Sequence, residues 1–352
     1  MNIIIIGAGI IGASIFNELT EKYKNHVTII EQGRIAELGA TSVSGGILRC
    51  FERTSELVEQ AKYSLNKYKN FQDYANAKSV FVESGCVYPI YKDRDIEEVK
   101  YLIKQMESKI NLEFIDRFQL ETLLPNTNWK DYLGAILEKE AGHFCPKYAT
   151  KSLINFGLSK GGIVLENTKC LQILHTNNQI KGIKTGLKTL EADIVIVCSG
   201  AWSTQLAEKS GIDVPKHLVA KAIQMARFKN DNQIINHAPA FIDDKSGLYG
   251  RSSNLNQLMI GLPTEEWNIE PDSFDGHNED HFKKIFSAAS HIWKLDPNDF
   301  NGHIRMFDAY TSDEKPIVQS SNLEGLFWAT GFNGGGFKFA PSIAKEISEL
   351  VN

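Results

Sequence analysis

The first thirty residues alternate between apolar runs and helix-like spacing, and this predicts a strand, a helix and a second strand. Ile3 to Ile6 is a continuous apolar run, which is typical of a strand buried on both faces of a sheet. Ile15, Phe16 and Leu19 then recur at helical spacing, and Val27 to Ile30 forms a second apolar run. We therefore expect a β-α-β unit at the N-terminus.

Two more buried strands are predicted far along the chain, at Ile194 to Val197 and at Leu326 to Gly331. Each runs into glycine and then a helix, so we expect one sheet assembled from separated segments. Further helices are expected from Ser55 to about Ala75, from Ile96 to Met106, from Cys145-Pro146 to Gly161-Gly162, around Asp280 to Trp293, and from near Pro341 to the C-terminus. A hairpin is expected from Phe81-Val82 and Val87 to Tyr91, joined across Glu83-Ser84-Gly85.

Between about Pro215 and Gly302 the pattern changes to alternating strands, at Ala222 to Phe228, Ala240 to Ile242 and Gln257 to Gly261. The fold class is therefore α/β, with a Rossmann-like nucleotide-binding domain assembled from separated segments and an α+β substrate domain built on an antiparallel sheet. We assign residues 1–80, 145–214 and 303–352 to the first domain and residues 81–144 and 215–302 to the second. The cofactor and the substrate should meet at the interface of the two domains.

Glycines between the first strand and helix give the spacing G-x-G-x-x-G. Gly7 permits the tight turn, Gly9 lets the backbone approach a pyrophosphate, and Gly12 lets helix and strand pack closely. The pyrophosphate would lie on the helix N-terminus. Glu31 ends the second strand, nineteen residues beyond the third glycine, and suits a ribose hydroxyl. The unit predicts a dinucleotide-binding protein.

Composition excludes several other classes of protein. The chain has 352 residues, is 42% hydrophobic and 23% charged, and carries a net charge of −5, which argues against nucleic-acid binding. No apolar run is long enough for a membrane span, and the N-terminus does not resemble a signal peptide. The five cysteines are scattered, so we expect reduced thiols in a cytoplasmic protein. No metal site is predicted, because no ligand spacing is visible among the cysteines or among His143, His217, His237, His277, His281, His291 and His303.

Four segments resemble the FAD-dependent amine and D-amino-acid oxidoreductases of the glycine oxidase, monomeric sarcosine oxidase and D-amino-acid dehydrogenase type. They are the GAGIIG segment with Glu31, the Ser44-Gly45-Gly46 loop running to Arg49, the segment Cys198 to Ser203, and Thr311 to Val318 followed by Ala329 to Lys338. The last is similar to the family's T-P-D-x-x-P-I-I-G and A-T-G-x-x-G-x-G-F-K pattern. This C-terminal pattern points to FAD, which G-x-G-x-x-G alone would not distinguish from NAD.

The resemblance implies where FAD lies. The ADP half would lie on the N-terminal glycines and Glu31. The loop from Ser42 to Gly46 would run along the pyrophosphate and the flavin, and the strand at Cys170 would cover the adenine. The glycine loop before Pro341 would face the pyrimidine edge of the flavin. The cofactor-binding residues so implied are Gly7, Gly9, Ile10, Ile11, Gly12, Glu31, Ser42, Ser44, Gly45, Gly46, Cys170, Ser199, Gly200, Trp202, Arg305, Asn333, Gly334, Gly335, Gly336, Phe337 and Lys338.

The same resemblance implies two cations at the substrate. Arg49 matches a carboxylate-binding arginine, and Lys338 matches the lysine of the family's F-K pair, acting either as a substrate ligand or as a charge that tunes the flavin. Tyr249 and Arg251 are further candidates for the pocket wall, with Tyr249 equally suited to the core.

The chain also departs from the family pattern. Asp308 stands where glycine oxidases have the arginine that grips the substrate carboxylate, and the nearest arginine is Arg305. Met306 stands where members with covalent flavin have cysteine, so non-covalent FAD is expected.

The resemblance implies an oxidoreductase that oxidises the C–N bond of an amino acid or related amine by hydride transfer to flavin N5. Two alternatives remain open: a maturation enzyme that oxidises a residue of a peptide or partner protein, and a catalytically silent flavin-binding subunit. The substrate, the electron acceptor and the oligomeric state are left open.

Overall fold

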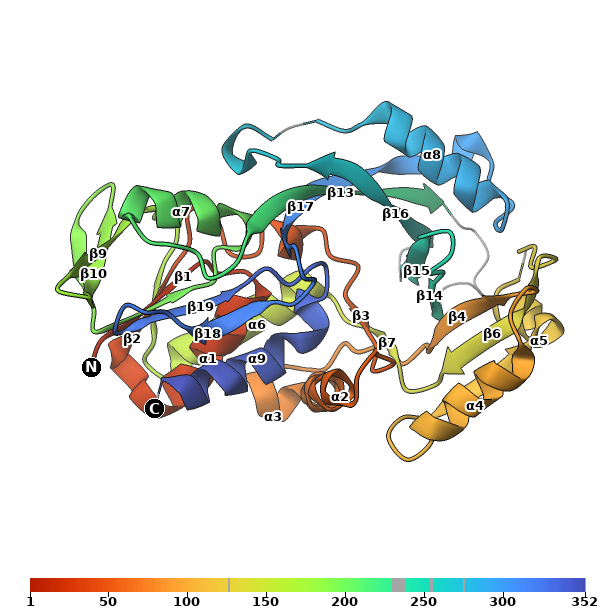
Figure 1. The fold of residues 1–352 in the computed structure, drawn as a ribbon, viewed down its shortest axis with the longest axis horizontal. Coiled ribbons are helices and arrows are strands. Elements are labelled where there is room, and N and C mark those ends of the chain that lie inside the picture. Colours follow the sequence, from red (N-terminus) through yellow and green to blue (C-terminus); the bar gives the residue numbers. More distant parts are fainter. Residues whose placement is uncertain (126, 230–237, 254–255, 275, 352) are drawn as a thin grey trace.

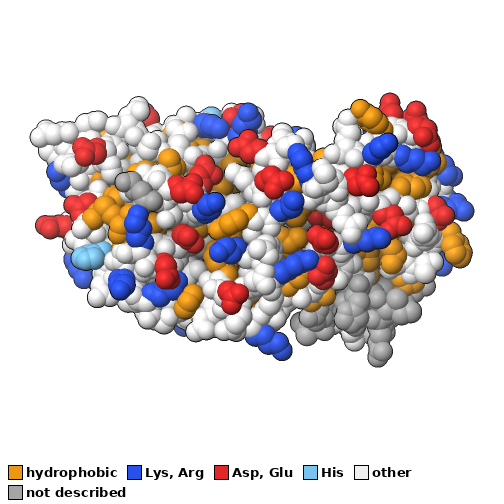
Figure 2. Space-filling model, turned by 90° about the horizontal axis from the view of Figure 1, so that it is seen from below, with side chains coloured by type: hydrophobic (Ala, Val, Ile, Leu, Met, Phe, Trp, Pro, Cys, Tyr) orange, Lys and Arg blue, Asp and Glu red, His pale blue; other side chains and the backbone are white. Residues whose placement is uncertain are grey.

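The computed structural model describes residues 1–125, 127–229, 238–253, 256–274 and 276–351. His237, one of the histidines considered above, lies outside these residues. Two large sheets lie side by side, with helices on their outer surfaces (Figure 1). On the face shown in Figure 2, acidic and basic side chains are interspersed rather than gathered by sign. No helix in the described part of the chain has the length and apolar character to cross a membrane.

The six-stranded sheet confirms the predicted assembly from separated segments. Its strands lie in the order β18 (Ile317–Ser320), β19 (Leu326–Thr330), β12 (Ile194–Val197), β1 (Ile3–Ile6), β2 (Val27–Ile30) and β8 (Ile163–Leu165). Neighbouring strands are parallel except for β18, which runs antiparallel to β19. Every residue of β1, β12 and β19 is buried, as the continuous apolar runs predict.

Both faces of this sheet are covered, because alternate residues of β1 enter two separate cores. Ile3 and Ile5 pack with α1 (Ile10–Tyr23), α6 (Pro146–Ser159) and α9 (Gly336–Leu350). Ile4 and Ile6 pack with α7 (Ser203–Ser210) and a small sheet of β9 (Cys170–Thr176), β10 (Gln179–Thr185) and β11 (Thr189–Glu191). Helices α2 (Ser55–Lys69) and α3 (Phe71–Ala75) complete the first of these layers (Figure 1).

The eight-stranded sheet forms the other half of the molecule. Its order is β17 (Phe300–Thr311), β13 (Leu218–Lys229), β16 (Gln257–Trp267), β15 (Tyr249–Ser253), β14 (Ala240–Ile242), β4 (Cys86–Tyr91), β6 (Tyr132–Glu138) and β5 (Leu112–Asp116). All pairs are antiparallel except β14 with β4. Helix α8 (Glu279–Ser290) covers its outer face, and α4 (Ile96–Met106) and α5 (Arg117–Leu123) lie at the β5 end (Figure 1).

Shorter elements connect the two halves. A two-stranded ladder pairs β3 (Ile47–Leu48) with β7 (Gly142–His143), and the 3₁₀ turns include η2 (Ala40–Ser42) and η3 (Gly200–Trp202). The mixed α/β architecture confirms the predicted fold class. The boundary predicted near residue 303 falls inside β17, whose residues pair with β13 throughout the larger sheet.

Two local predictions were wrong. Val82 does not form a hairpin with β4; it bridges to His143 instead, because β4 is paired on both sides by β6 and β14. The helix expected from Ser55 to Ala75 is divided at Asn70, whose side-chain amide bonds back to Asn66 in place of a continuing turn.

The C-terminal helix begins five residues before the expected start at Pro341, at Gly336. Pro341 has no N–H to donate to the carbonyl of Phe337, one turn earlier. The hydroxyl of Tyr68, on α2, donates to that carbonyl at 2.9 Å instead. A side chain from another helix thus compensates for a proline inside α9.

Candidate active site

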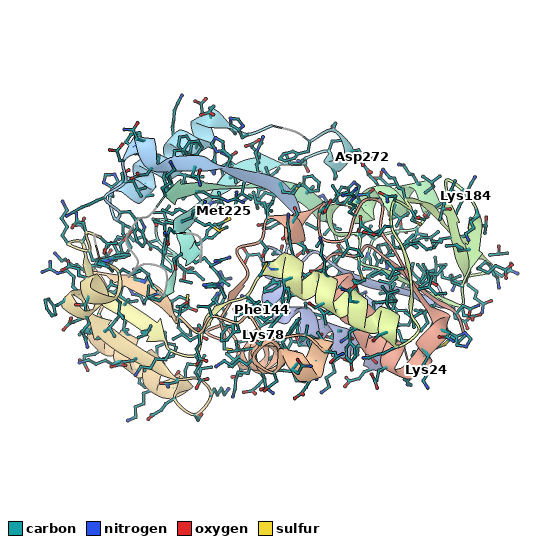
Figure 3. All side chains as sticks on the ribbon, turned by 180° about the vertical axis from the view of Figure 1, so that it is seen from behind. Lys24, Lys78, Phe144, Lys184, Met225 and Asp272 are labelled. Carbon is teal, nitrogen blue, oxygen red and sulfur yellow. The ribbon has the colours of Figure 1, made fainter. Side chains whose placement is uncertain are left out.

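A cavity of about 650 Å³ lies between the two sheets, and the carboxyl ends of β1, β2, β12 and β19 open into it. This is the edge at which open α/β sheets bind their ligands. The opposite wall comes from β13, β15, β16 and β17, and includes Met225, labelled in Figure 3. The volume is within the range of small-molecule and cofactor sites.

The N-terminal glycines have the close contacts that their spacing predicts. A Cβ on Gly12 would lie 1.9 Å from the carbonyl oxygen of Gly7, so α1 can approach β1 only with glycine at this position. Gly7 has a φ of +103°, and a Cβ there would lie 2.6 Å from the carbonyl oxygen of Cys198. A Cβ on Gly9 would meet only the hydroxyl of Thr41, at 3.2 Å, which leaves Gly9 open toward the cavity.

The N-terminus of α1 points its amides at this cavity. Gly9 is the N-cap and provides no side-chain cap, while the hydroxyl of Thr41 accepts a hydrogen bond from the amide of Ile10 at 3.0 Å. The next amides of the first turn have no partner within the helix, as at any helix start. This end of the helix therefore offers N–H groups and the positive end of the helix dipole to an anion.

Glu31 ends β2 at the wall of the cavity. Its two carboxylate oxygens accept hydrogen bonds from the amides of Ala8, at 2.9 Å, and Gly33, at 3.0 Å. These contacts hold the carboxylate in one orientation. Each oxygen retains a second lone pair that can accept from a ligand hydroxyl.

The loop from Gly39 to Gly46 crosses the cavity between β2 and β3. Gly46 has a φ of +64°, and a Cβ there would lie 2.1 Å from the carbonyl oxygen of Phe144. Ser44 accepts a hydrogen bond from the amide of Gly46, and both residues line the cavity together with Gly45. Ser42 is not in the wall; its hydroxyl donates to the carbonyl of Gly39 within η2.

The wall beyond Glu31 is formed by Cys170, Ser199, Gly200 and Trp202, all of them predicted cofactor contacts. The indole N–H of Trp202 donates to Asp272 at 2.9 Å, which fixes the ring at the rim. Figure 3 labels Asp272 at this end of the larger sheet.

The C-terminal glycine loop closes the other end of the cavity. Asn333 has a φ of +52°, and its side-chain oxygen accepts from the amide of Thr311 at 2.9 Å. The amide of Gly334 donates to Asp308 at 3.1 Å, and burial raises the pKa of Asp308 to about 6, against the opposing effect of its amide donors. Asp308 therefore anchors the loop to β17 while lining the cavity.

Two cations in the cavity wall beside this loop, Arg49 and Lys338, meet one carboxylate, that of Glu52. Arg49 Nη1 lies 2.8 Å from Glu52 Oε1, and Lys338 Nζ contacts the same oxygen. Arg49 also donates to the carbonyl of Phe51 at 2.5 Å. The side chains of Arg49, Glu52 and Lys338 are 22%, 10% and 12% exposed, so solvent screens their charges only in part.

The two cations differ in how firmly they hold their charge. Burial alone would lower the pKa of Arg49, but the neighbouring Tyr88 and Glu52 raise it above its ordinary value. Burial and the charge of Arg49 lower the pKa of Lys338 to about 8, although Glu52 acts in the opposite direction. Arg49 is therefore a permanent cation, whereas Lys338 can lose its proton under mildly alkaline conditions.

Glu138, on β6 of the larger sheet, positions the segment that carries these charges. Its carboxylate accepts from the amides of Cys50, at 2.5 Å, and Phe51, at 3.1 Å, and from the hydroxyl of Tyr88 at 2.8 Å. Burial raises the pKa of Glu138, against the effect of these three donors. The backbone after Arg49 is thus tied to the sheet that forms the opposite wall.

The face of the larger sheet toward the cavity carries further polar side chains. Lys221 and Asp308 are directly opposite one another in the β13–β17 register, and the ammonium of Lys221 lies 4.1 Å from the ring centre of Trp267. Tyr249 lines the cavity, and its ring packs against Gly261; a Cβ on Gly261 would lie 2.3 Å from the Tyr249 ring. Burial raises the pKa of Tyr249 to about 12.

Besides Ser42, three predicted site residues lie outside the cavity wall. Arg251 is buried and donates to the carbonyls of Gly45 and Ser252, so it joins β15 to the small-residue loop rather than facing a ligand. Arg305 pairs with Glu266 and lies over the ring of Phe274. Gly12 is also behind the wall, where its close packing on Gly7 requires it.

The residues that the sequence analysis missed include Thr41, Glu52, Glu138 and Lys221. Lys221 had a visible signal, since it is a charged residue inside an apolar strand. Thr41 lies in a single 3₁₀ turn and Glu52 in an irregular segment, and their partners are distant in sequence. Glu52 and Lys338, for example, are 286 residues apart.

Comparison with known proteins finds relatives that match nearly the whole chain. 4-Methylaminobutanoate oxidase (formaldehyde-forming) of Paenarthrobacter nicotinovorans is 26% identical over 359 residues, which cover 99% of this chain and 43% of the relative. The mitochondrial pyruvate dehydrogenase phosphatase regulatory subunit of Mus musculus is 23% identical over 369 residues, which cover 99% of this chain and 41% of the relative. The chain thus spans about two fifths of the length of these two relatives.

The crystal structure of L-proline dehydrogenase from P. horikoshii has the same fold, with a TM-score of 0.88 at 23% identity, covering 100% of this chain and 93% of that one. Residues 2–350 match the DAO family, described as FAD dependent oxidoreductase. This match confirms the resemblance predicted from the four segments and gives FAD as the family's cofactor. The chain belongs to the FAD dependent oxidoreductase family.

Proposed function

We propose that this chain uses FAD to oxidise the C–N bond of an amino acid or related amine whose carboxylate binds Arg49 and Lys338. The observation that carries the proposal is that Arg49 and Lys338, both in the cavity wall, converge on a single carboxylate oxygen, that of Glu52, which is not itself in the wall. A site that holds one carboxylate in this way has the donors to hold another. The names of the relatives, an amine oxidase and a proline dehydrogenase, support the same reaction class.

The residues of the cavity fit FAD. The open face of Gly9 and the uncapped start of α1 suit the pyrophosphate, and Glu31 suits the ribose. The glycine loop that Asp308 anchors would face the flavin. When bound, FAD supplies the acceptor for a hydride from the C–H beside the amine nitrogen.

The protein's own contribution is positioning. The guanidinium of Arg49 offers a planar fork to a carboxylate, and Lys338 adds a point charge. The two positive charges exceed the single negative charge of Glu52, so the site favours a substrate that brings a second anion. The incoming carboxylate must share the cations with Glu52 or displace it. When the carboxylate is held, the rest of a small substrate is also fixed within the cavity. This orientation of the substrate is the protein's main contribution to the reaction.

A second candidate, a flavin-binding regulatory subunit without catalysis, is favoured by the relative named as a phosphatase regulatory subunit. Anaerobic mixing of the yellow protein with a panel of N-methylated amino acids, cyclic amino acids, simple amines and short peptides separates the candidates. We expect free amino acids to bleach the flavin. Bleaching by peptides alone would favour the maturation enzyme, and no bleaching at all would favour the silent subunit.

Acid precipitation is expected to release all of the yellow colour into the supernatant. Met306 occupies the position at which covalent members of the family have cysteine, and a thioether side chain does not form that link. The absorbance of the supernatant and of the redissolved pellet measures the two fractions. Flavin that stays with the denatured chain would contradict non-covalent binding.

Binding of a small carboxylic acid such as benzoate should weaken as the pH rises through about 8. Below this pH Lys338 is charged and contributes to binding; above it the free protein must first take up a proton, and affinity falls by up to about tenfold per pH unit. Perturbation of the flavin spectrum measures the affinity between pH 6.5 and 9.5. The Lys338→Met variant should bind more weakly and show no such decline, whereas a decline of equal size in this variant would assign it to another group.

A further inference from the structure

Two histidines and a glutamate come together on the outer side of the larger sheet, apart from the cavity. His277 and Glu279 flank the N-cap of α8, and His303 lies on β17. The Nε2 atoms of His277 and His303 lie 2.6 Å and 3.5 Å from Glu279 Oε1, and all three ligand atoms are within 4.8 Å of one another. None of these three residues contributes to the cavity wall.

The backbone between His277 and Glu279 is fixed. The amide of Asn278 donates to the side-chain oxygen of Gln224 at 2.9 Å, and the side-chain amide of Gln224 donates back to the carbonyl of Asn278 at 2.8 Å. The side chain of Asn278 also donates to Glu266 at 3.0 Å. Gln224 is fully buried on β13, the strand that pairs with β17, so the start of α8 is held in register with His303.

His303 is the least satisfied member of the cluster. Its side chain is only 12% exposed, and its Nδ1 is buried with no hydrogen-bond partner among the described residues. Its Nε2 faces Glu279 at 3.5 Å, which is longer than a good hydrogen bond. The ring of His277 stacks on it with centroids 4.2 Å apart and planes 19° apart, so both rings extend toward the same carboxylate. Nε2 of His303 therefore makes no close hydrogen bond to Glu279 and is available to a metal ion bound by the same carboxylate.

We propose that His277, Glu279 and His303 form a binding site for a divalent transition metal, with Zn²⁺ as the reference ion. Neutral imidazole and carboxylate are its ordinary ligands, and water completes the coordination. Bonds of about 2.0–2.1 Å place tetrahedral ligand atoms roughly 3.3 Å apart. The 3.5 Å separation of His303 Nε2 from Glu279 Oε1 is close to this value, and the 2.6 Å separation of His277 Nε2 from the same oxygen would have to widen. The two imidazole ligands favour Zn²⁺ over Mg²⁺ or Ca²⁺, which prefer oxygen ligands.

Such a metal would join the first turn of α8 to β17. The same strand carries Asp308 and Tyr310 into the cavity wall, five and seven residues after His303. The site would therefore stabilise the outer side of the sheet whose inner face lines the cavity, whichever substrate binds there.

The test uses holoprotein without a polyhistidine tag, stripped of metal by a chelator, in a Cys145→Ser background, because Cys145 is an exposed thiol. Zn²⁺ alone is titrated by calorimetry, and bound zinc is counted after dialysis. We expect one equivalent of Zn²⁺ and a rise in Tm that depends on zinc concentration. The variants His277→Ala, Glu279→Gln and His303→Ala should each weaken binding by roughly tenfold or more.

His291→Ala is the matched control, since it removes an exposed histidine at the opposite end of α8. It should retain the full equivalent. Because His303 is largely buried, the two exposed positions, His277 and Glu279, keep the test valid if His303→Ala does not fold. Absence of saturable zinc binding by the parent protein, or binding that all three cluster variants retain, would overturn the proposal.

Discussion

A Gly9→Val protein is expected to fold and to purify with at least roughly tenfold less FAD than the parent. Gly9 has a φ of −70°, which valine adopts freely, and its nearest neighbour beyond the adjoining chain is the hydroxyl of Thr41 at 3.2 Å. The added side chain would instead fill the space in which the pyrophosphate approaches the backbone. The ratio of flavin to protein absorbance measures the loss. A full complement of FAD would show that this turn is not the phosphate site.

Gly12→Ala is the matched comparison, with a different expected defect. Its Cβ would lie 1.9 Å from the backbone oxygen of Gly7, and backbone cannot rotate away as a side chain can. Helix α1 would have to move off β1, at a cost of at least the roughly 1–3 kcal/mol typical of overpacked cores. We therefore expect Gly12→Ala to lower stability as well as FAD content, whereas Gly9→Val lowers FAD content alone. The Tm of each apoprotein separates the two.

Arg49→Ala is expected to lower the affinity for a carboxylate substrate by about 2–5 kcal/mol, the range for removing one partner of a buried, hydrogen-bonded charge pair. This corresponds to a rise in Kd from roughly 30-fold to several thousand-fold. Arg49→Lys keeps the charge but loses the fork, and should fall between the parent and Arg49→Ala. Normal substrate binding by Arg49→Ala would remove this residue from the site.

Glu52→Gln should act in the opposite direction. Glutamine keeps the shape of Glu52 but removes the negative charge that Arg49 and Lys338 share. Carboxylate inhibitors should then bind more tightly, on the order of tenfold. Weaker binding would mean that Glu52 helps to hold the ligand instead of competing with it.

The sequence predicted those elements in which a local pattern of residues indicates burial or a particular backbone geometry. Ile3 to Ile6 and Ile194 to Val197 are continuous apolar runs because both faces of their sheet are covered. Gly7 and Gly12 mark a turn and a close contact within one β-α unit, so their roles were readable from spacing alone.

The features that escaped prediction depend on side chains distant in the sequence. The early start of α9 was hidden because Tyr68, on another helix, satisfies the carbonyl that Pro341 leaves open. Arg251 was predicted to line the pocket because its strand leads toward the substrate. The sequence pattern of that strand could not predict that the guanidinium donates to the carbonyl of Gly45. His277 and His303 have no ligand spacing in the sequence, and only the packing of α8 on β17 brings them together.

We propose that Arg49 and Lys338 hold the carboxylate of an amine substrate while its C–N bond is oxidised. The anaerobic rate of flavin reduction by the best amino acid of the panel, compared with the rate for its carboxamide at equal low concentrations, tests this proposal. We expect the acid to reduce the flavin, and the amide, which has the same amine but no anion, to reduce it at least roughly 30-fold more slowly. Equal rates with the two compounds would contradict it.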